Sequence, residues 1–172
     1  MKHFRFKIFF VLALFVMPFF ISVAHADTVG QTTTFYVNNK YDQFGRTSLS
    51  ATLRNVSDRA YFYVEDRYWD NLNSNQKAIL DNNISGLAQE FDDNIYSKET
   101  QFWGSEPNPG IDNDPRITIL LEDLISGNGG YFDSSNEYPK KNSGSSNERE
   151  MISINIQSGN LAKMFLGHEF QH

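Results

Sequence analysis

The most restrictive segment of the sequence is the pentapeptide His168-Glu169-Phe170-Gln171-His172. Its histidines are four residues apart, and positions i and i+4 lie on one face of an α-helix. Two imidazoles one turn apart can bind the same tetrahedral cation, and the glutamate between them can act on a water bound to it. The pattern therefore predicts a helix with His168 and His172 as zinc ligands and Glu169 as general base.

The residues before the pentapeptide predict a strand, a short turn and then this helix. Met151 to Ile156 alternates like a strand with one wet face, and Ser158-Gly159-Asn160 offers a cap for a helix from Leu161. On a helical wheel, four side chains fall within about 60° of one another: Leu161, Phe165, His168 and His172. The imidazoles would extend an inward-facing apolar stripe, so we expect the site to face a cleft.

The N-terminal segment predicts export. Three basic residues stand among the first seven, an apolar run extends from Ile8 to Val23, and Ala24-His25-Ala26 follows. These are the three parts of a secretory signal peptide, and the run is shorter than the roughly 20 residues of a membrane-spanning helix. We expect residues 1–26 to be removed and residues 27–172 to be secreted, without stable membrane association. An uncleaved anchor is the alternative.

Charge and cysteine content narrow the function classes. The formal net charge is −6, and removal of residues 1–26, which hold three basic residues and no acidic one, leaves −9. An acidic chain argues against nucleic acid and anionic membranes as partners, because both require clustered Lys and Arg. The chain has no cysteine. Packing, or bound cations, must therefore hold an exported domain together.

Hydrophobic periodicity predicts strands in the N-terminal part. Thr33 to Val37 and Ala60 to Val64 are dense in aromatic and β-branched residues, and Ser48 to Arg54 alternates polar and apolar positions. Such segments are typical of strands, the last of them half-buried. We expect an N-terminal strand pair or hairpin.

The middle of the chain predicts a helix and a buried strand, which makes the fold class α+β. Asn75 to Tyr96 repeats apolar residues at three- and four-residue steps, with Asn73 or Ser74 as the cap. Ile117 to Leu121 is nearly continuous apolar and predicts a central strand. The polar segment from Tyr138 to Glu150 predicts an exposed loop.

The run Ser158-Gly159-Asn160-Leu161-Ala162, followed by the pentapeptide, resembles the active-site helix of secreted bacterial zincin metallopeptidases, especially hyicolysin-like and immune-inhibitor-A-like peptidases. Asp112 to Leu120 and Gly130 to Phe132 are similar to the strand and turn segments before that helix. The resemblance covers Tyr61 to His172. It implies a zincin-like N-terminal subdomain, with a twisted mixed sheet, a backing helix and the metal helix beneath it.

The resemblance also implies a zinc-dependent endopeptidase acting on proteins or peptides. Zinc would polarise the scissile carbonyl and lower the pKa of a bound water, while Glu169 takes the proton of that water and passes it to the leaving amine. Either Met151 to Ile156 or Gly130 to Phe132 would line the cleft, where an extended peptide could pair with an edge strand. A noncatalytic extracellular binding module on the same scaffold is the alternative.

The zinc site needs a further ligand. A catalytic zinc usually has three protein ligands plus a water, and the other two histidines, His3 and His25, fall in the predicted signal peptide. The third ligand is then an upstream carboxylate or a residue beyond position 172, and we favour the second. We expect residues 27–172 to be the N-terminal portion of the catalytic domain, with weak zinc binding and no peptidase activity alone.

Three other features of the sequence lead to predictions. Asp112 and Asp114 could ligate calcium, although Asp and Asn before proline are also ordinary turn formers. Further oxygen donors are available in Glu122, Asp123 and Asp133. Trp69 and Trp103 are expected in the core rather than as carbohydrate platforms. Gly167 stands where many zincin helices carry alanine. Glycine within a helix lowers its stability by about 1 kcal/mol relative to alanine.

Overall fold

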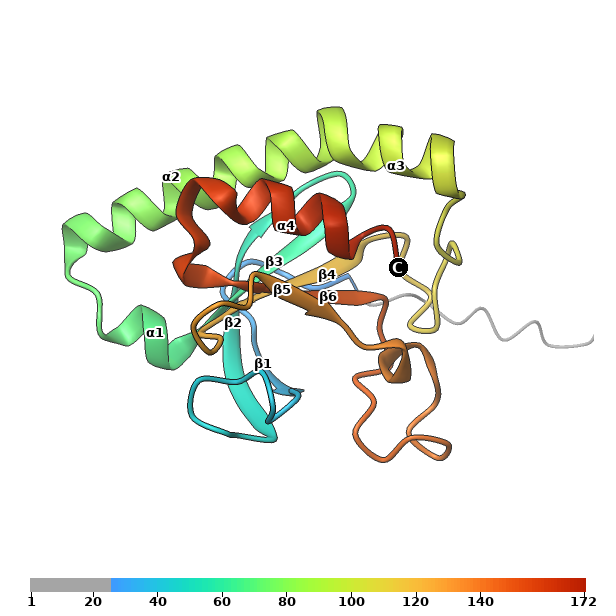
Figure 1. Ribbon diagram of the computed structural model, residues 1–172, viewed down its shortest axis with the longest axis horizontal. Coiled ribbons are helices and arrows are strands. Elements are labelled where there is room, and N and C mark those ends of the chain that lie inside the picture. Colours follow the sequence, from blue (N-terminus) through green and yellow to red (C-terminus); the bar gives the residue numbers. More distant parts are fainter. Residues whose placement is uncertain (1–25) are drawn as a thin grey trace, which may run out of the picture.

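Six strands form one mixed sheet in the computed structural model, which describes residues 26–172 (Figure 1). In sequence order they are β1 (Thr32–Tyr36), β2 (Ser48–Val56), β3 (Ala60–Glu65), β4 (Ile117–Glu122), β5 (Gly130–Phe132) and β6 (Met151–Asn155). Their order in the sheet is β1-β2-β3-β4-β6-β5. The predicted α+β fold class is confirmed. The predicted signal peptide, apart from Ala26, lies outside the described residues.

The N-terminal half of the sheet is an antiparallel meander. β1 pairs with β2, and β2 pairs with β3, with a register shift between Leu53 and Asn55. Leu49, Ala51 and Leu53 are buried, as expected from the alternation of polar and apolar residues in this strand. The predicted N-terminal strand pair is confirmed.

The C-terminal half of the sheet is built around β4. β4 runs parallel to β3 and to β6, while β5 runs antiparallel to β6 and forms the edge of the sheet. Every residue of β4 is buried, which confirms the predicted central strand. Of the two segments expected to line a cleft, only Gly130–Phe132 is an edge strand, because β6 lies between β4 and β5.

Apolar side chains cover both faces of the sheet. On one face, strand residues such as Phe62, Ile119 and Ile154 pack against helix residues such as Phe91 and Leu166. The other face buries a second cluster, which includes Phe35, Leu53, Tyr63, Leu120 and Met151. The expected wet face of the strand at Met151 to Ile156 is therefore wrong: all of β6 is buried, because a core lies on each side of it.

A long helix crosses one face of the sheet. After the short α1 (Asp66–Asp70), the chain forms α2 (Ser74–Glu90), a π-helical turn η1 (Phe91–Ile95) and α3 (Tyr96–Trp103) without a break. The Asn73 side chain accepts a hydrogen bond from the Gln76 backbone N–H, so Asn73 is the cap. Figure 1 shows α2, α3 and α4 on the same side of the sheet. No helix within the described residues is long and apolar enough to cross a membrane.

The segment after β6 forms a 3₁₀ turn, η3 (Ile156–Leu161), and then α4 (Ala162–Glu169). The expected cap at Ser158-Gly159-Asn160 is wrong, because Gly159 has a φ of 52° that breaks the helical path, and α4 starts without a side-chain cap. A positive φ is easily adopted only by glycine. Gly159 therefore sets the angle at which α4 leaves the sheet.

The segment from Tyr138 to Glu150 follows the short 3₁₀ helix η2 (Ser134–Glu137). It is a loop, as expected, but it is not uniformly exposed: Ser146 and Glu150 are buried. The Ser146 hydroxyl contacts the carbonyls of Asn136 and Tyr138. The loop therefore folds back onto the molecule and carries Glu150 inward.

Candidate metal centre

α4 is fixed to the molecule by its apolar side. Leu166 is fully buried. The Phe170 ring packs against two others, with its centroid 5.2 Å from that of Phe91 and 5.6 Å from that of Tyr96. Phe91 belongs to η1 and Tyr96 opens α3, so the C-terminal end of α4 rests on the junction of those two elements.

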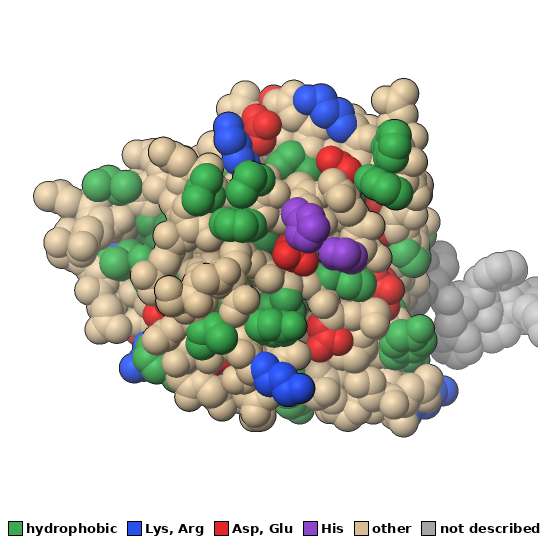
Figure 2. Space-filling model, viewed as in Figure 1, with side chains coloured by type: hydrophobic (Ala, Val, Ile, Leu, Met, Phe, Trp, Pro, Cys, Tyr) green, Lys and Arg blue, Asp and Glu red, His purple; other side chains and the backbone are tan. Residues whose placement is uncertain are grey.

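The two histidines lie at the surface. His168 and His172 are both exposed, and Leu161 is 55 % exposed. The expected inward stripe through these residues is wrong, because Leu166 rather than His168 faces the core. Figure 2 shows the two imidazoles side by side on one face of the molecule, next to acidic side chains.

The imidazole rings are spaced like two ligands of one ion. Their centroids are 5.3 Å apart and their planes make an angle of 87°. If each ring nitrogen is about 2.1 Å from a tetrahedral zinc, the two centroids lie about 5 Å apart. The spacing of the two rings is thus compatible with two ligands of one zinc ion.

The α-helix does not extend over the whole pentapeptide. It ends at Glu169, after which the backbone N–H of His172 donates to the carbonyl of Glu169. This i to i−3 bond tightens the last turn, as often occurs where α-helices end. The prediction that a regular helix carries both histidines is thus wrong in detail.

Glu169 lies beside the edge strand. It is half-buried, and its Cγ would be 3.0 Å from a Cβ built on Gly130. That same Cβ would be 2.8 Å from the carbonyl oxygen of Ser153. Because Gly130 has no Cβ, β5, β6 and Glu169 can approach one another. Glu169 therefore lies next to the edge strand β5, to which an extended peptide could be added.

Of the residues predicted to ligate zinc, the structure brings His168 and His172 together as a pair. Within residues 26–172, no group of three or more His, Cys, Asp or Glu side chains is arranged to hold a metal ion. His168 and His172 thus remain a pair in this part of the chain. The donor types and the ring spacing fit zinc, while the third ligand stays a prediction.

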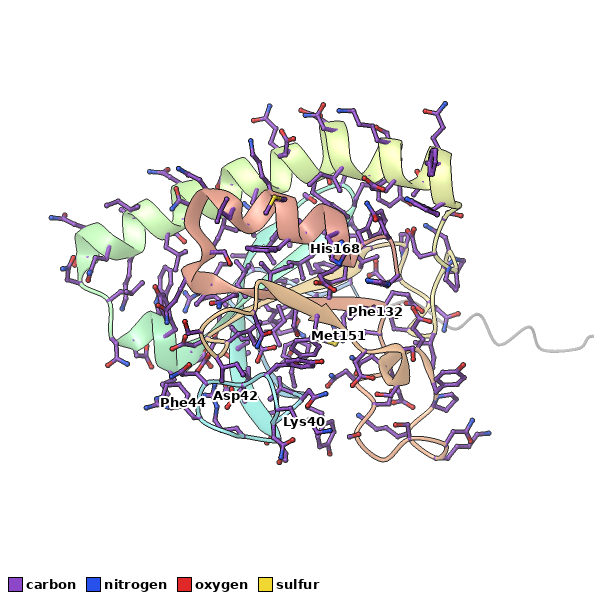
Figure 3. The ribbon with its side chains drawn as sticks, in the orientation of Figure 1. Lys40, Asp42, Phe44, Phe132, Met151 and His168 are labelled. Atoms are coloured by element: carbon purple, nitrogen blue, oxygen red, sulfur yellow. The ribbon has the colours of Figure 1, made fainter. Side chains whose placement is uncertain are left out.

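A cavity of about 260 Å³ adjoins the pair. It is lined by segments that are distant in the sequence, including Trp103, Glu106, Glu137, Glu150, Glu169 and His172. Figure 3 labels Phe132 of β5 and Met151 of β6, whose side chains also line it, together with His168 on α4. Glu106, Glu137 and Glu150 belong to no sequence motif, because each lies in a separate loop or turn.

Trp103 differs from its prediction. It is 61 % exposed and packs edge-to-face on the exposed Phe102, whereas Trp69 packs against the core as expected. Trp103 ends α3, and the chain turns away at Gly104, whose φ is 97°. The indole is thus placed at the wall of the cavity rather than in the core.

The carboxylates of Asp112 and Asp114, predicted as possible calcium ligands, accept hydrogen bonds from other groups of the protein. Asp114 accepts hydrogen bonds from the Tyr61 hydroxyl and the Arg116 backbone N–H, and Asp112 accepts one from the Asp114 backbone N–H. Burial raises the pKa of Asp112. Glu122 lies at the opposite end of β4 from Asp114. These contacts are those of a structural turn, and a calcium site here stays an untested prediction.

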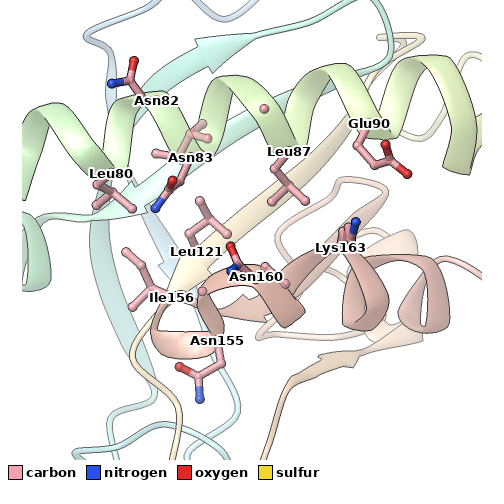
Figure 4. Close-up of a pocket in the computed structure, with 14 residues that line it drawn as sticks. Leu80, Asn82, Asn83, Leu87, Glu90, Leu121, Asn155, Ile156, Asn160 and Lys163 are labelled. Atoms are coloured by element: carbon pink, nitrogen blue, oxygen red, sulfur yellow. The ribbon is translucent and has the colours of Figure 1, made fainter.

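A second cavity, of about 310 Å³, opens between α2 and the start of α4 (Figure 4). Apolar side chains such as Leu80, Leu87 and Ile156 line it, with Asn83, Asn160 and Lys163 also at its wall. None of the residues of the pentapeptide contributes to it. The chemistry-bearing groups gather at the other end of α4.

The fold and site define an α+β protein with an exposed histidine pair and a glutamate beside a sheet edge. No protein-family model and no curated protein sequence matches the chain.

Proposed function

We propose that the protein is a secreted zinc metallopeptidase of the zincin type, which hydrolyses peptide bonds in proteins or peptides. The observation that carries this proposal is the 5.3 Å spacing of the His168 and His172 rings, with Glu169 between them in sequence and beside an edge strand. The two imidazoles supply the donor type that zinc prefers, and the carboxylate supplies a base.

The reaction assigns a separate task to each side chain. Bound zinc would polarise the scissile carbonyl and promote ionisation of a water. His168 and His172 would hold the ion. Glu169 accepts a proton from the attacking water and delivers it to the leaving amine. Its half-buried position beside Gly130 places it next to the edge strand.

The exposed edge of β5 supports an extended peptide as the substrate. Gly130–Phe132 pairs only with β6 among the described strands. Unpaired backbone groups on its other side can bind a peptide as an additional strand. A peptide placed there would pass next to Glu169.

The contacts of Asp27 are compatible with signal cleavage after Ala26. The Asp27 carboxylate accepts hydrogen bonds from the Tyr63 hydroxyl and from Arg149. Cleavage before Asp27 would leave these contacts in place. N-terminal sequencing of the exported protein should start at Asp27, and a retained N-terminus would favour the membrane anchor instead.

The activity is tested by casein hydrolysis with the full-length protein that the gene encodes. We expect wild-type protein to contain zinc and to cleave casein. Glu169→Gln should retain zinc but lose turnover by at least about a hundredfold, whereas His168→Ala should lose both. Undiminished activity of Glu169→Gln would rule out the assigned base.

The exposed pair of Phe102 and Trp103 favours a second candidate, a noncatalytic extracellular binding module, because exposed aromatic side chains are common at binding surfaces. A zinc-free and inactive full-length wild type would support this alternative.

A further inference from the structure

The turn before β5 holds Asn128-Gly129, the only Asn-Gly pair in the sequence. Gly127 has a φ of 95°, and the Asn128 backbone N–H donates to the Ile125 carbonyl, 3.2 Å away. Gly127 is exposed and Asn128 is half-buried. Asn128 and Gly129 also line a surface groove of about 580 Å³. Water therefore reaches this pair.

The side chain of Asn128 and the backbone nitrogen of Gly129 are free to react with each other. Within residues 26–172, neither the Asn128 side chain nor the Gly129 backbone N–H forms a hydrogen bond. Glycine has no side chain that would shield its nitrogen from the neighbouring amide. An asparagine in such a position is chemically labile.

Asn155 stabilises the form of the peptide group that reacts. Its side-chain N–H donates to the Asn128 carbonyl oxygen at 2.8 Å, and its backbone N–H donates to the Gly129 carbonyl oxygen at 2.9 Å. When the Gly129 nitrogen loses its proton, resonance places part of the negative charge on the Asn128 carbonyl oxygen. A hydrogen bond aimed at that oxygen stabilises the charge. Asn155 is only 8 % exposed, so this donor is held in place.

We propose that Asn128-Gly129 is a self-modification site, at which asparagine is converted to aspartate and isoaspartate without an enzyme. The Gly129 nitrogen gives up its proton and bonds to Asn128 Cγ. The bond from Cγ to the side-chain nitrogen breaks, and ammonia leaves with that proton. Water then opens the cyclic succinimide. Attack of water on the side-chain carbonyl gives aspartate, and attack on the backbone carbonyl gives isoaspartate.

The isoaspartate product would disturb the contact between β5 and α4. A Cβ on Gly129 would lie 2.2 Å from Phe165 Cδ1, and a Cβ on Gly130 would lie 3.0 Å from Glu169 Cγ. The backbone of this segment therefore has little room to shift. Isoaspartate adds a methylene group to the backbone before Gly129, so it must displace Phe165 or the start of β5. Lower peptidase activity would follow, an effect that rests on the proposed function, whereas the modification itself does not.

The test ages the full-length protein at mildly alkaline pH and physiological temperature. Peptide mapping with mass spectrometry follows each asparagine. We expect Asn128 to lose its amide at least about tenfold faster than Asn142. Asn142 is also exposed, but it precedes Ser143 rather than a glycine. Aspartate and isoaspartate should appear as two peptides of equal mass that separate in chromatography.

The same protein unfolded in guanidinium chloride is the reference for the effect of the fold. Because the turn is open to water and Asn155 donates to the Asn128 carbonyl, the folded protein should lose the Asn128 amide at least as fast as the unfolded chain. Slower loss in the folded protein would overturn the proposal, since the fold would then protect the pair.

Two substitutions separate the modification from its effects. Asn128→Gln should keep its amide during the same treatment, because its longer side chain would have to close a larger ring. Freshly purified Asn128→Asp supplies the aspartate product alone, and it should unfold at the same urea concentration as fresh wild type. Aged wild type should lose stability and peptidase activity in proportion to its isoaspartate content.

The modification and the proposed function fail separately. If Asn128 loses its amide in a protein without peptidase activity, the modification site stands and the peptidase is wrong. If Asn128 keeps its amide as long as Asn142 does, the modification site is wrong, whatever the activity. Equal losses of activity in aged wild type and aged Asn128→Gln would overturn the effect of isoaspartate on the peptidase.

Discussion

At the scale of single residues, we expect substitution by alanine to have opposite effects on stability at two glycines near the histidine pair. A Cβ on Gly130 would lie 2.8 Å from the Ser153 carbonyl oxygen and 3.0 Å from Glu169 Cγ. Since the carbonyl belongs to the sheet backbone, it cannot move cheaply. Gly130→Ala should lower the free energy of unfolding by about 1–3 kcal/mol and reduce peptidase activity, because Glu169 must shift.

Gly167→Ala is the matched control. Its Cβ would meet only Ile95 Cγ2, at 3.9 Å, which is ordinary contact. Alanine also favours the helix, so stability should rise by up to about 1 kcal/mol. Urea unfolding measures both variants. Equal effects of the two changes would contradict the close approach of β5 to Glu169.

Glu122 predicts a dependence of stability on pH. It is fully buried, its Oε1 accepts a hydrogen bond from the Tyr131 hydroxyl, and its Oε2 has no partner in the described part of the chain. Burial, together with the charges of Asp42 and Glu65, raises its pKa from 4.5 to about 7. The folded protein therefore binds a proton that the unfolded chain has released, and stability falls as pH rises from 4.5 to about 7.

Glu122→Gln removes this titration. The variant should become more stable relative to wild type between pH 5 and pH 8, by up to about 3 kcal/mol. Chemical denaturation across this pH range measures the difference, with Glu99→Gln as a control that should follow wild type. Parallel curves for wild type and Glu122→Gln would show that Glu122 does not titrate in this range.

At the scale of elements, the C-terminal end of α4 packs against the π-helical turn η1 and the start of α3. Phe170 packs on Phe91 and Tyr96, and His172 follows it by two residues. Phe170→Ala should cost about 2 kcal/mol of stability and should weaken zinc binding, because the turn that carries His172 loses its support. Phe170→Leu, which keeps much of the apolar volume, should retain most of both. The measurements are urea unfolding and zinc affinity.

The periodicity of the sequence predicted the positions of strands and helices better than it predicted their burial and their caps. Apolar runs identified β3 and β4, and the three- and four-residue steps identified α2, because these patterns depend on local geometry. The burial of Ser153 on β6 was missed, since it depends on a second core that forms only when distant strands meet. The cap of α4 was missed because Gly159 adopts a positive φ.

At the scale of the whole molecule, a sheet with a core on each face positions the edge strand, α4 and the loop ends around one acidic cavity. The His168, Glu169 and His172 set could be predicted from its spacing alone. The glutamates at 106, 137 and 150 could not, because their convergence depends on the path of three separate segments.

The most direct test of the account is the zinc content of the full-length protein, measured by mass spectrometry after dialysis. It compares wild type, His172→Ala and the control Glu99→Gln, which removes a carboxylate from α3. The account predicts one zinc per molecule in wild type and in the control, and its loss in His172→Ala. A wild type without zinc, or a His172→Ala variant that retains it, would contradict the assignment of the histidine pair.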